Sequence, residues 1–236
     1  NELKKERLRE VAGLCEGNLR DVDGAIAAWR QLLALDRRDE SARTALMRLL
    51  EKSQRWDELA VVLEQEATTE ADRETKVFLE KRLARLQEEK RRDLVQAGEA
   101  WSRIARLVPD DDHAILTASK LFERGDRNDL AAAVIAESAT SIEDPVPRGQ
   151  LLQRLAELRE QLGEHIKAGD SYAEAAESLR NGKLWDEADR LYSAAESWEK
   201  AANAAYQRGL LTGDLKQQAA CYARAADYLQ RANRPD

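Results

Sequence analysis

Apolar and small residues along this chain recur at the three- and four-residue intervals of an amphipathic helix. One such stripe is formed by Ile26, Trp29, Leu32 and Leu33. No stretch alternates apolar and polar residues in the manner of a half-buried strand. The 11 glycines and four prolines are also too few for the many tight turns of an all-β protein. The pattern therefore predicts an all-α fold.

Aspartates stand where several of the expected helices begin. A carboxylate in that place accepts hydrogen bonds from free backbone N–H groups and lies at the positive end of the helix. The residues concerned are Asp21, Asp39, Asp57, Asp93 and Asp111. The prolines at 109, 145 and 147 fall between apolar stripes, where a missing N–H group does no harm.

The sequence repeats itself at one constant offset. Segment 20–67 recurs as 92–139, and segment 82–88 recurs as 154–160. The clearest matches are Arg20-Asp21 with Arg92-Asp93, Ala28-Trp29 with Ala100-Trp101, and Arg82-Leu83-Ala84 with Arg154-Leu155-Ala156. Chance does not hold one offset over such a length. The repeat defines two blocks, 20–91 and 92–163. We expect residues from about Arg20 to Ala67 to superpose on those from about Arg92 to Ala139, with Trp29 and Trp101 in equivalent buried positions.

Each block contains two smaller units. The small residues that open the second helix of each unit are Ala25, Leu59, Ala97, Ala131 and Ala168, at steps of 34, 38, 34 and 37. A step near 34 is the length of two antiparallel helices with their short turns. The chain is therefore expected to stack helix pairs.

At these positions the chain resembles the tetratricopeptide-repeat (TPR) family. That family places an aromatic residue four positions after the small residue, as in Ala25/Trp29, Ala97/Trp101 and Ala168/Tyr172. The resemblance covers nearly the whole chain. It implies an α-solenoid, in which roughly a dozen antiparallel helices stack as TPR-like pairs into a right-handed superhelix.

The Ala- and Tyr-rich segment 164–236 departs from the regular spacing. Ala188 follows Ala168 too closely for a full helix pair, so the helix near 164–180 fits both as a second helix and as the first helix of the next unit. This segment is similar to the TPR-like helices of SNAP-type vesicle-fusion adaptors, which implies the same style of packing. We expect one domain over residues 1–236, with regular repeats over 1–163 and divergent repeats over 164–236.

The chain begins with Asn1 and continues directly into a charged helical pattern without an apolar signal-peptide core. We therefore expect a fragment of a longer protein, or a processed one. The longest apolar runs, such as 131–136, are too short to cross a bilayer. Cys15 and Cys221 have no CxxC neighbour and are expected to be buried thiols, which suits a cytoplasmic location.

The charge balance argues against a nucleic-acid partner. The chain carries 38 basic and 45 acidic residues, a net charge of −7. Non-specific nucleic-acid binding needs a surplus of Lys and Arg to neutralise phosphates. With 43% hydrophobic residues the chain is also too apolar to be disordered. The composition describes a folded domain with a highly charged surface.

No set of residues in the sequence suggests catalysis. His113 and His165 are isolated and are expected at exposed helix ends, and no GxSxG, GxxxxGK[ST] or GxGxxG motif occurs. We predict no catalytic, metal-binding or cofactor-binding residue, and therefore no enzyme. Packing between helices is the expected role of four tryptophans, while Trp198 is less constrained. The four are Trp29, Trp56, Trp101 and Trp185.

The resemblance implies that first helices line a concave surface, which is the family's usual peptide-binding site. Members that grip the C-terminal carboxylate of chaperones use Lys, Asn and Arg at fixed first-helix positions. The matching residues here are Glu10, Leu14, Ala45, Leu79 and Leu83. That clamp is absent, which disfavours chaperone binding of this kind.

A different set of cations recurs on the expected inner faces. The candidate partner-binding residues are Arg48, Lys52, Arg82, Lys120, Arg124 and Arg154. A basic stripe of this kind suits an acidic or phosphorylated segment of another protein. The alternative is that duplication preserved ordinary solvated helix charge, with Glu51 and Glu123 nearby to cancel the field.

The sequence therefore favours a non-catalytic protein–protein interaction scaffold that binds a partner on its concave surface. The alternative is a regulatory or sensory repeat domain attached to an enzyme elsewhere in the parent chain.

Overall fold

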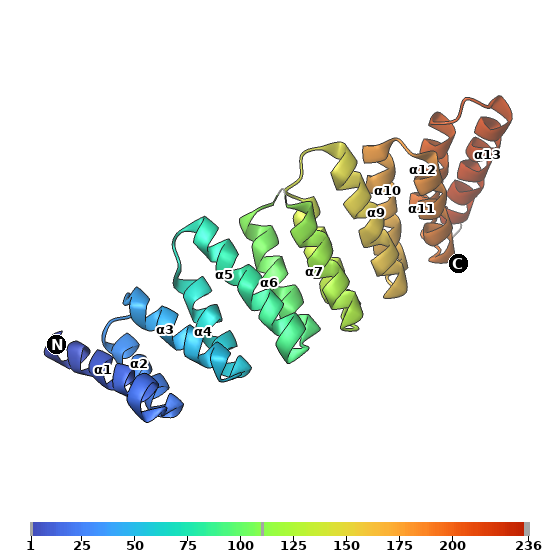
Figure 1. The fold of residues 1–236 in the computed structure, drawn as a ribbon. Coiled ribbons are helices and arrows are strands. Elements are labelled where there is room, and N and C mark those ends of the chain that lie inside the picture. The colour runs from blue at the N-terminus through green and yellow to red at the C-terminus, as the bar shows by residue number, and fades with distance from the viewer. Residues whose placement is uncertain (1, 110, 234–236) are drawn as a thin grey trace. The chain divides into compact units, whose positions relative to one another are not determined.

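The structure, a computed structural model, describes residues 2–109 and 111–233 apart from the side chain of Asn18. The expectation drawn from Asn1 lies outside these residues. All regular secondary structure in the described ranges is helical, which confirms the all-α prediction (Figure 1). The helices are α1 (Glu2–Leu14), η1 (Cys15–Leu19), α2 (Val22–Leu35), α3 (Glu40–Lys52), α4 (Trp56–Thr69), α5 (Arg73–Leu86), η2 (Gln87–Arg91), α6 (Leu94–Leu107), α7 (Asp112–Arg124), α8 (Asn128–Ala139), α9 (Pro145–Gln161), α10 (His165–Leu179), α11 (Gly182–Ala194), α12 (Trp198–Leu210) and α13 (Leu215–Ala232). The two η segments are π-helical.

The chain divides into two compact units, Asn1–Asp93 and Leu94–Asp236. The first contains α1–α5 with both π-helical segments, and the second contains α6–α13. Within each unit, every helix packs against the helix that follows it in the chain (Figure 1). Each unit is thus an α-solenoid of stacked helix pairs, as predicted. The expectation of one domain over residues 1–236 stays a prediction.

A buried apolar residue, alanine in every case but Leu59, occupies the fourth position of every second helix among the described residues. Ala25, Leu59, Ala97, Ala131 and Ala168 hold this position in α2, α4, α6, α8 and α10, and none is more than 2% exposed. Ala201 holds the same position in α12 and continues the series. The helix α10 is therefore a second helix only, and the frame runs on regularly. Ala188 is a false match to the series, because it lies in α11, a first helix.

The long repeat is visible in the helix boundaries. The bounds of α2 and α6, of α3 and α7, and of η1 and η2 are all related by the offset of the two blocks. Both π-helical segments end at a residue with left-handed backbone, Arg20 (φ 52°) and Arg92 (φ 57°). Buried residues match as well, for example Leu63 and Ile135. The helix bounds and the buried positions thus repeat at the expected offset, while superposition of the two blocks stays a prediction.

Capping by aspartate is confirmed at three of the five expected positions. The carboxylates of Asp21, Asp39 and Asp111 each accept from the backbone N–H three residues later, at 2.9–3.1 Å. Asp57 has a different role, because it lies inside α4 and accepts from Arg91 Nε at 2.7 Å. These caps fix where α2, α3 and α7 begin.

The tryptophans are less buried than the sequence predicts. Trp185 is 3% exposed, but Trp29, Trp56 and Trp101 are only half-buried. Trp29 Nε1 donates to Glu16 Oε1 at 2.9 Å, which explains its place at the edge of the core. An indole combines an apolar body with one N–H group that needs a partner, so a helix-pair edge suits it. Trp29 and Trp101 are therefore alike in burial, but less buried than expected.

The two cysteines and Trp198 also differ from one another in how deeply they are buried. Cys15 is buried as expected, whereas Cys221 is half-buried. Trp198 is half-buried and stacks on Tyr228 of α13, with ring centroids 5.9 Å apart.

Candidate functional site

All six cations proposed from the sequence lie on first helices. Arg48 and Lys52 are on α3 and Arg82 is on α5, all in the first unit. The others belong to the second unit, where they are Lys120 and Arg124 on α7 and Arg154 on α9. Their joint action as one stripe stays a prediction.

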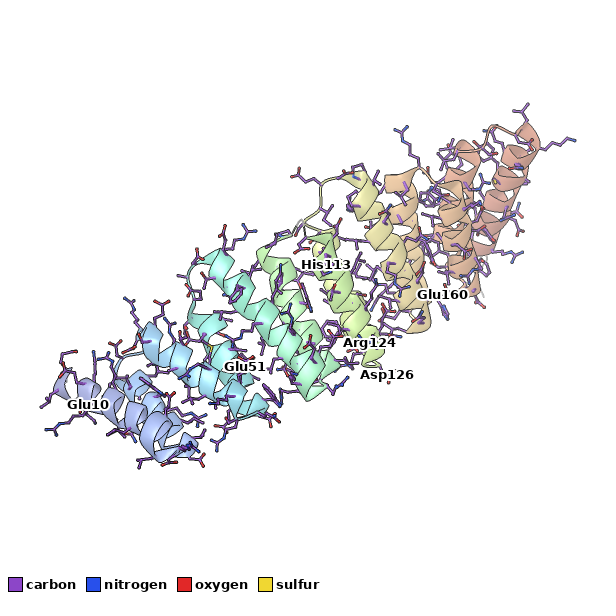
Figure 2. All side chains as sticks on the ribbon, in the orientation of Figure 1. Glu10, Glu51, His113, Arg124, Asp126 and Glu160 are labelled. Carbon is purple, nitrogen blue, oxygen red and sulfur yellow. The ribbon has the colours of Figure 1, made fainter. Side chains whose placement is uncertain are left out.

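Three of these cations pair with a glutamate on the preceding first helix or its π-helical end. Arg48 pairs with Glu16, which lies in η1. Arg82 Nη2 lies 2.8 Å from Glu51 Oε2, and Arg154 Nη2 lies 2.5 Å from Glu123 Oε2. A fourth pair, Arg190–Glu160, continues the series between α11 and α9 at 2.8 Å. Figure 2 labels Glu51 and Glu160 near the C-terminal ends of their helices.

This series of ion pairs explains why the cations recur. Each pair joins two successive first helices, so both partners must repeat with the helices that they connect. A partly exposed ion pair contributes about 0–1 kcal/mol to stability and is weakened by salt. The arginines of these pairs have a packing role whether or not they also bind a partner.

Lys52 and Lys120 differ from these arginines. Both side chains are exposed, and within the described residues neither takes part in an ion pair. Of the proposed stripe, they are the residues best placed to meet a partner.

A groove of about 460 Å³ lies in the first unit, lined by residues of α3, α4, α5 and η2. Its floor is apolar and includes Leu59, Leu63 and Leu86, with the half-buried Trp56 beside them. Phe78 is 65% exposed and borders the same groove. Pockets that bind small molecules commonly have volumes of about 300–1,000 Å³. A groove of about 460 Å³ is therefore large enough to hold a side chain.

Cations outnumber carboxylates around this groove. Its lining contains four basic side chains and only two carboxylates, Glu51 and Glu89. Glu51 is held by Arg82, while Glu89 lies 4.0 Å from Arg85. The basic residues are Lys81, Arg82, Arg85 and Lys90. The groove is therefore positive in a chain whose net charge is −7.

Lys90 and Trp56 form a pair at one end of the groove. Lys90 Nζ lies 5.6 Å from the centroid of the Trp56 ring, within the range of a cation–π interaction. Lys90 belongs to η2 and Trp56 is the first residue of α4. The π-helical end of α5 thus completes the rim of the groove.

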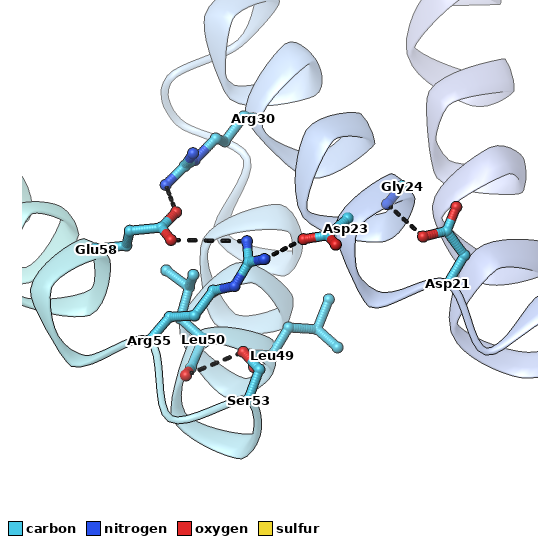
Figure 3. Close-up of polar contacts among 9 residues, drawn as sticks. All are labelled: Asp21, Asp23, Gly24, Arg30, Leu49, Leu50, Ser53, Arg55 and Glu58. Carbon is cyan, nitrogen blue, oxygen red and sulfur yellow. Dashed lines mark hydrogen bonds and ion pairs between the residues drawn. The ribbon is translucent and has the colours of Figure 1, made fainter.

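A second hollow of about 510 Å³ shares Trp56 and Lys90 but is lined mainly by polar residues. Arg55, which lines it, pairs with Asp23 and lies 3.6 Å from Glu58. Arg30 Nη2 reaches the same glutamate at 2.6 Å, so α2 and α4 are joined by a small network (Figure 3). The arginines that line this hollow, Arg55 and Arg91, are therefore already held in ion pairs with carboxylates.

The shifted pKa values follow the surface ion pairs. The hydrogen bond from Arg127 lowers the pKa of Asp129 to about 2, and that from Arg106 lowers the pKa of Glu137. Burial, followed by the hydrogen bond to Asp170, raises the pKa of Tyr192. The Asp129 shift arises at the start of α8 itself, whereas the other two arise where one helix contacts another. Within residues 2–109 and 111–233, no three His, Cys, Asp or Glu side chains gather in the manner of a metal site.

The positions of the carboxylate clamp lack the side chains that it requires. Leu79 and Leu83 are buried in α5, at 8% and 2% exposure, so they contribute to the core instead of a ligand site. His113 and His165 are exposed near the starts of α7 and α10, as expected. In the described part of the chain, no helix has the length and apolar character needed to cross a bilayer.

Four groove residues were not expected from the sequence: Phe78, Lys81, Arg85 and Lys90. The candidate cations were those retained from one block to the other, and these four residues are not retained. These four residues can be recognised in the sequence only by comparing the two blocks and noting where they differ.

Comparisons with known proteins give similarity to solved helical-repeat structures. No family model matches the chain, and no curated protein matches it. The TPR2AB-domain:pHSP90-complex of yeast Sti1 is 11% identical, with a TM-score of 0.34, over 96% of this chain and 100% of that one. BtubC from P. vanneervenii is 13% identical with a TM-score of 0.38, over 97% of this chain and 94% of that one.

A tetratricopeptide repeat protein from Parabacteroides merdae is 14% identical, with a TM-score of 0.36, over 98% of this chain and 92% of that one. Similarities at this level carry no functional assignment. Function must be inferred from the groove and the first-helix faces of this chain.

Proposed function

We propose that this chain is a non-catalytic scaffold that binds a partner protein through the exposed faces of its first helices. The observation that carries the proposal is the groove in the first unit, which combines an apolar floor, the exposed Phe78 ring and a positive rim. Aromatic residues and arginine are enriched where proteins bind one another, and they supply much of the binding energy. Stacked helix pairs present such surfaces on a rigid frame.

The proposed partner segment is acidic or phosphorylated, because the exposed cations of the first helices attract negative charge. Lys52 and Lys120 support this part of the proposal, since both are exposed. A cytoplasmic location and the absence of a nucleic-acid partner also belong to the proposal, and the net charge of −7 supports the latter.

The test is direct binding by the purified chain. Proteins retained by the full chain are identified, purified and titrated against it, and hydrogen exchange then maps which amides become protected. The proposal expects protection on first helices and an affinity that falls with added salt. Retained proteins that protect only second helices, or none that bind the purified chain directly, would contradict it.

The double substitution Lys52→Glu/Lys120→Glu tests the stripe separately. Because exposed charges contribute little to folding, the thermal unfolding transition is expected to stay nearly unchanged while partner binding weakens. Equal binding by this variant removes these lysines from the site.

A further inference from the structure

The two blocks, 20–91 and 92–163, differ at the groove in an informative way. Residues that hold the helices together are the same in both blocks. The Glu51–Arg82 ion pair recurs as Glu123–Arg154, and the buried Leu86 recurs as Leu158. The helix frame therefore does not depend on the residues that change.

The residues that change are the aromatic and basic ones around the groove. In the second block their places are taken by Asn128, Gln150, Gln153 and Glu157, which replace Trp56, Phe78, Lys81 and Arg85 in that order. Lys90 lies in η2, and the end of α9 has no cation in its place. The second block thus loses both rings and three cations and gains one carboxylate.

Two of the replacements in the second block form hydrogen bonds with neighbouring polar side chains. Arg154 Nη1 donates to Glu157 at 2.6 Å, and Asn128 Nδ2 donates to Gln161 at 3.1 Å. In the first block the corresponding charges are less well matched, because Arg85 stands where Glu157 would accept. The same frame therefore carries a neutralised polar surface in one block and an apolar, positive groove in the other.

A single inserted residue accompanies this difference. The helices α5 and α9 begin at equivalent positions of the two blocks, Arg73 and Pro145. The next helices, α6 and α10, begin at Leu94 and His165, which are out of that register by one position. Where α9 continues as an α-helix, the first block changes to the π-helix η2. A π-helix accommodates an additional residue, and such segments are frequent at functional sites. Here the segment places Lys90 over the Trp56 ring.

We propose that this groove is the docking site of an acidic peptide segment with one large apolar side chain. The apolar side chain enters the groove against Trp56 and Phe78. The carboxylates that flank it face Lys81, Arg85 and Lys90. This inference rests on the proposed scaffold function and names both the site and the chemistry of its partner.

The composition of the groove favours a peptide over a nucleic acid. Aromatic rings and cations also bind single strands, by stacking and by phosphate contacts. A continuous phosphate backbone, however, would approach Glu51 and Glu89 in the rim. A peptide can place its few carboxylates opposite the cations and an uncharged residue opposite each glutamate.

The test uses short synthetic peptides and fluorescence anisotropy with the full chain. The first probe is a peptide of Asp, Glu, Gly and Ser residues with one central Phe. In the second, Ala replaces the Phe, and in the third, Lys replaces every Asp and Glu. A single-stranded oligothymidylate is the fourth probe. We expect the first peptide to bind at least about tenfold more tightly than the other probes, because a buried aromatic anchor dominates such contacts.

The decisive variant introduces the residues of the second block, Phe78→Gln/Lys81→Gln/Arg85→Glu. All three positions are exposed, so its unfolding transition should match that of the unmodified chain. The control variant Arg37→Glu/Arg38→Gln changes the net charge by the same amount but lies outside the groove. Its two residues are in the turn before α3, and Glu51, the groove residue on α3, is at the opposite end of that helix. We expect at least about tenfold weaker binding for the first variant and unchanged binding for the control.

Trp56→Asn provides an independent check at the floor of the groove, with loss of the same peptide expected. The proposal is overturned if the second-block variant binds the first peptide normally, or if the control loses as much affinity. Tighter binding of oligothymidylate would also overturn it, in favour of a nucleic-acid site. A natural partner that binds the second-block variant normally refutes the groove but leaves the scaffold function standing. The scaffold function fails on different results: no protein binds the purified chain directly, or those that bind protect only second helices.

Discussion

Gly98 provides a sharp test of how tightly the helix pairs are packed. It lies within α6, and a Cβ atom placed on it would be 2.8 Å from Cε1 and 2.9 Å from Cδ1 of Phe122 in α7. In the first block the same two positions hold Ile26 and Leu50, both buried. Where the first-helix residue is Leu50, the second helix can hold Ile26. Where the first-helix residue is the larger Phe122, the second helix has a glycine. The glycine makes room for the ring.

Two opposing effects decide the outcome of Gly98→Ala. Replacing glycine by alanine inside a helix stabilises it by about 0.5–1 kcal/mol, because the unfolded chain loses entropy. Crowding a well-packed core costs about 1–3 kcal/mol. We therefore expect the free energy of unfolding to fall by about 1 kcal/mol. The matched control is Gly13→Ala in α1, where no neighbour lies within 4 Å, and there we expect a gain of about 0.5–1 kcal/mol.

Urea unfolding followed by circular dichroism measures both changes, and amide hydrogen exchange shows whether they are local to α6–α7 and α1–α2. Combining Gly98→Ala with Phe122→Leu should remove the crowding, because the added Cβ meets ring atoms of Phe122 that leucine, the residue at position 50 of the first block, does not have. If Gly98→Ala stabilises the chain as much as Gly13→Ala does, Phe122 moves aside freely and close packing does not require glycine at this position.

Three further predictions concern surface groups. A double-mutant cycle with Glu51→Ala and Arg82→Ala should give a coupling of about 0.2–1 kcal/mol that shrinks in high salt; a coupling unaffected by salt would be inconsistent with a partly exposed ion pair. Gln54 and Asp126 have left-handed backbones (φ 58° and 56°), so glycine at either should raise the urea midpoint by the equivalent of about 0.5–1 kcal/mol. The pKa of Asp129 is lowered to about 2 against about 4 when unfolded, so its contribution to stability is full above about pH 4 and is lost as the pH falls through 2. The urea midpoint should therefore decrease as the pH is lowered from 4 to 2, and the decrease should be smaller in the Asp129→Asn variant.

The helix frame could be predicted because it is encoded locally and repeatedly. The small residue at the fourth position of each second helix must be buried for two helices to approach, so it recurs wherever a pair is built. The frame was lost only near Ala188, where an alanine in a first helix imitates that position. Ala201, which continues the series, is distinguished from its alanine neighbours only by the spacing.

The depth of side chains could not be predicted in the same way. A helical stripe shows which face points inward, but not how far the neighbouring helix extends over it. Trp29 and Trp185 both occupy packing positions in the pattern, yet only Trp185 is buried. Trp29 remains at the edge because Glu16 accepts its N–H, and these two residues lie on different helices. That contact depends on tertiary geometry that the periodic pattern does not contain.

Recurrence across the duplication also marks residues that hold successive repeats together. Arg82 and Arg154 recur because each pairs with a glutamate on the preceding first helix. Any residue that serves the contact between repeats must reappear with that contact. A residue that serves a partner has no reason to reappear unless both blocks bind alike. Phe78 and Arg85 are replaced by Gln150 and Glu157 in a block that forms the same helices. The fold does not require them, since the side chains of both residues are exposed. Their presence in one block is therefore better explained by a ligand than by the solenoid, and the second-block variant separates these two causes.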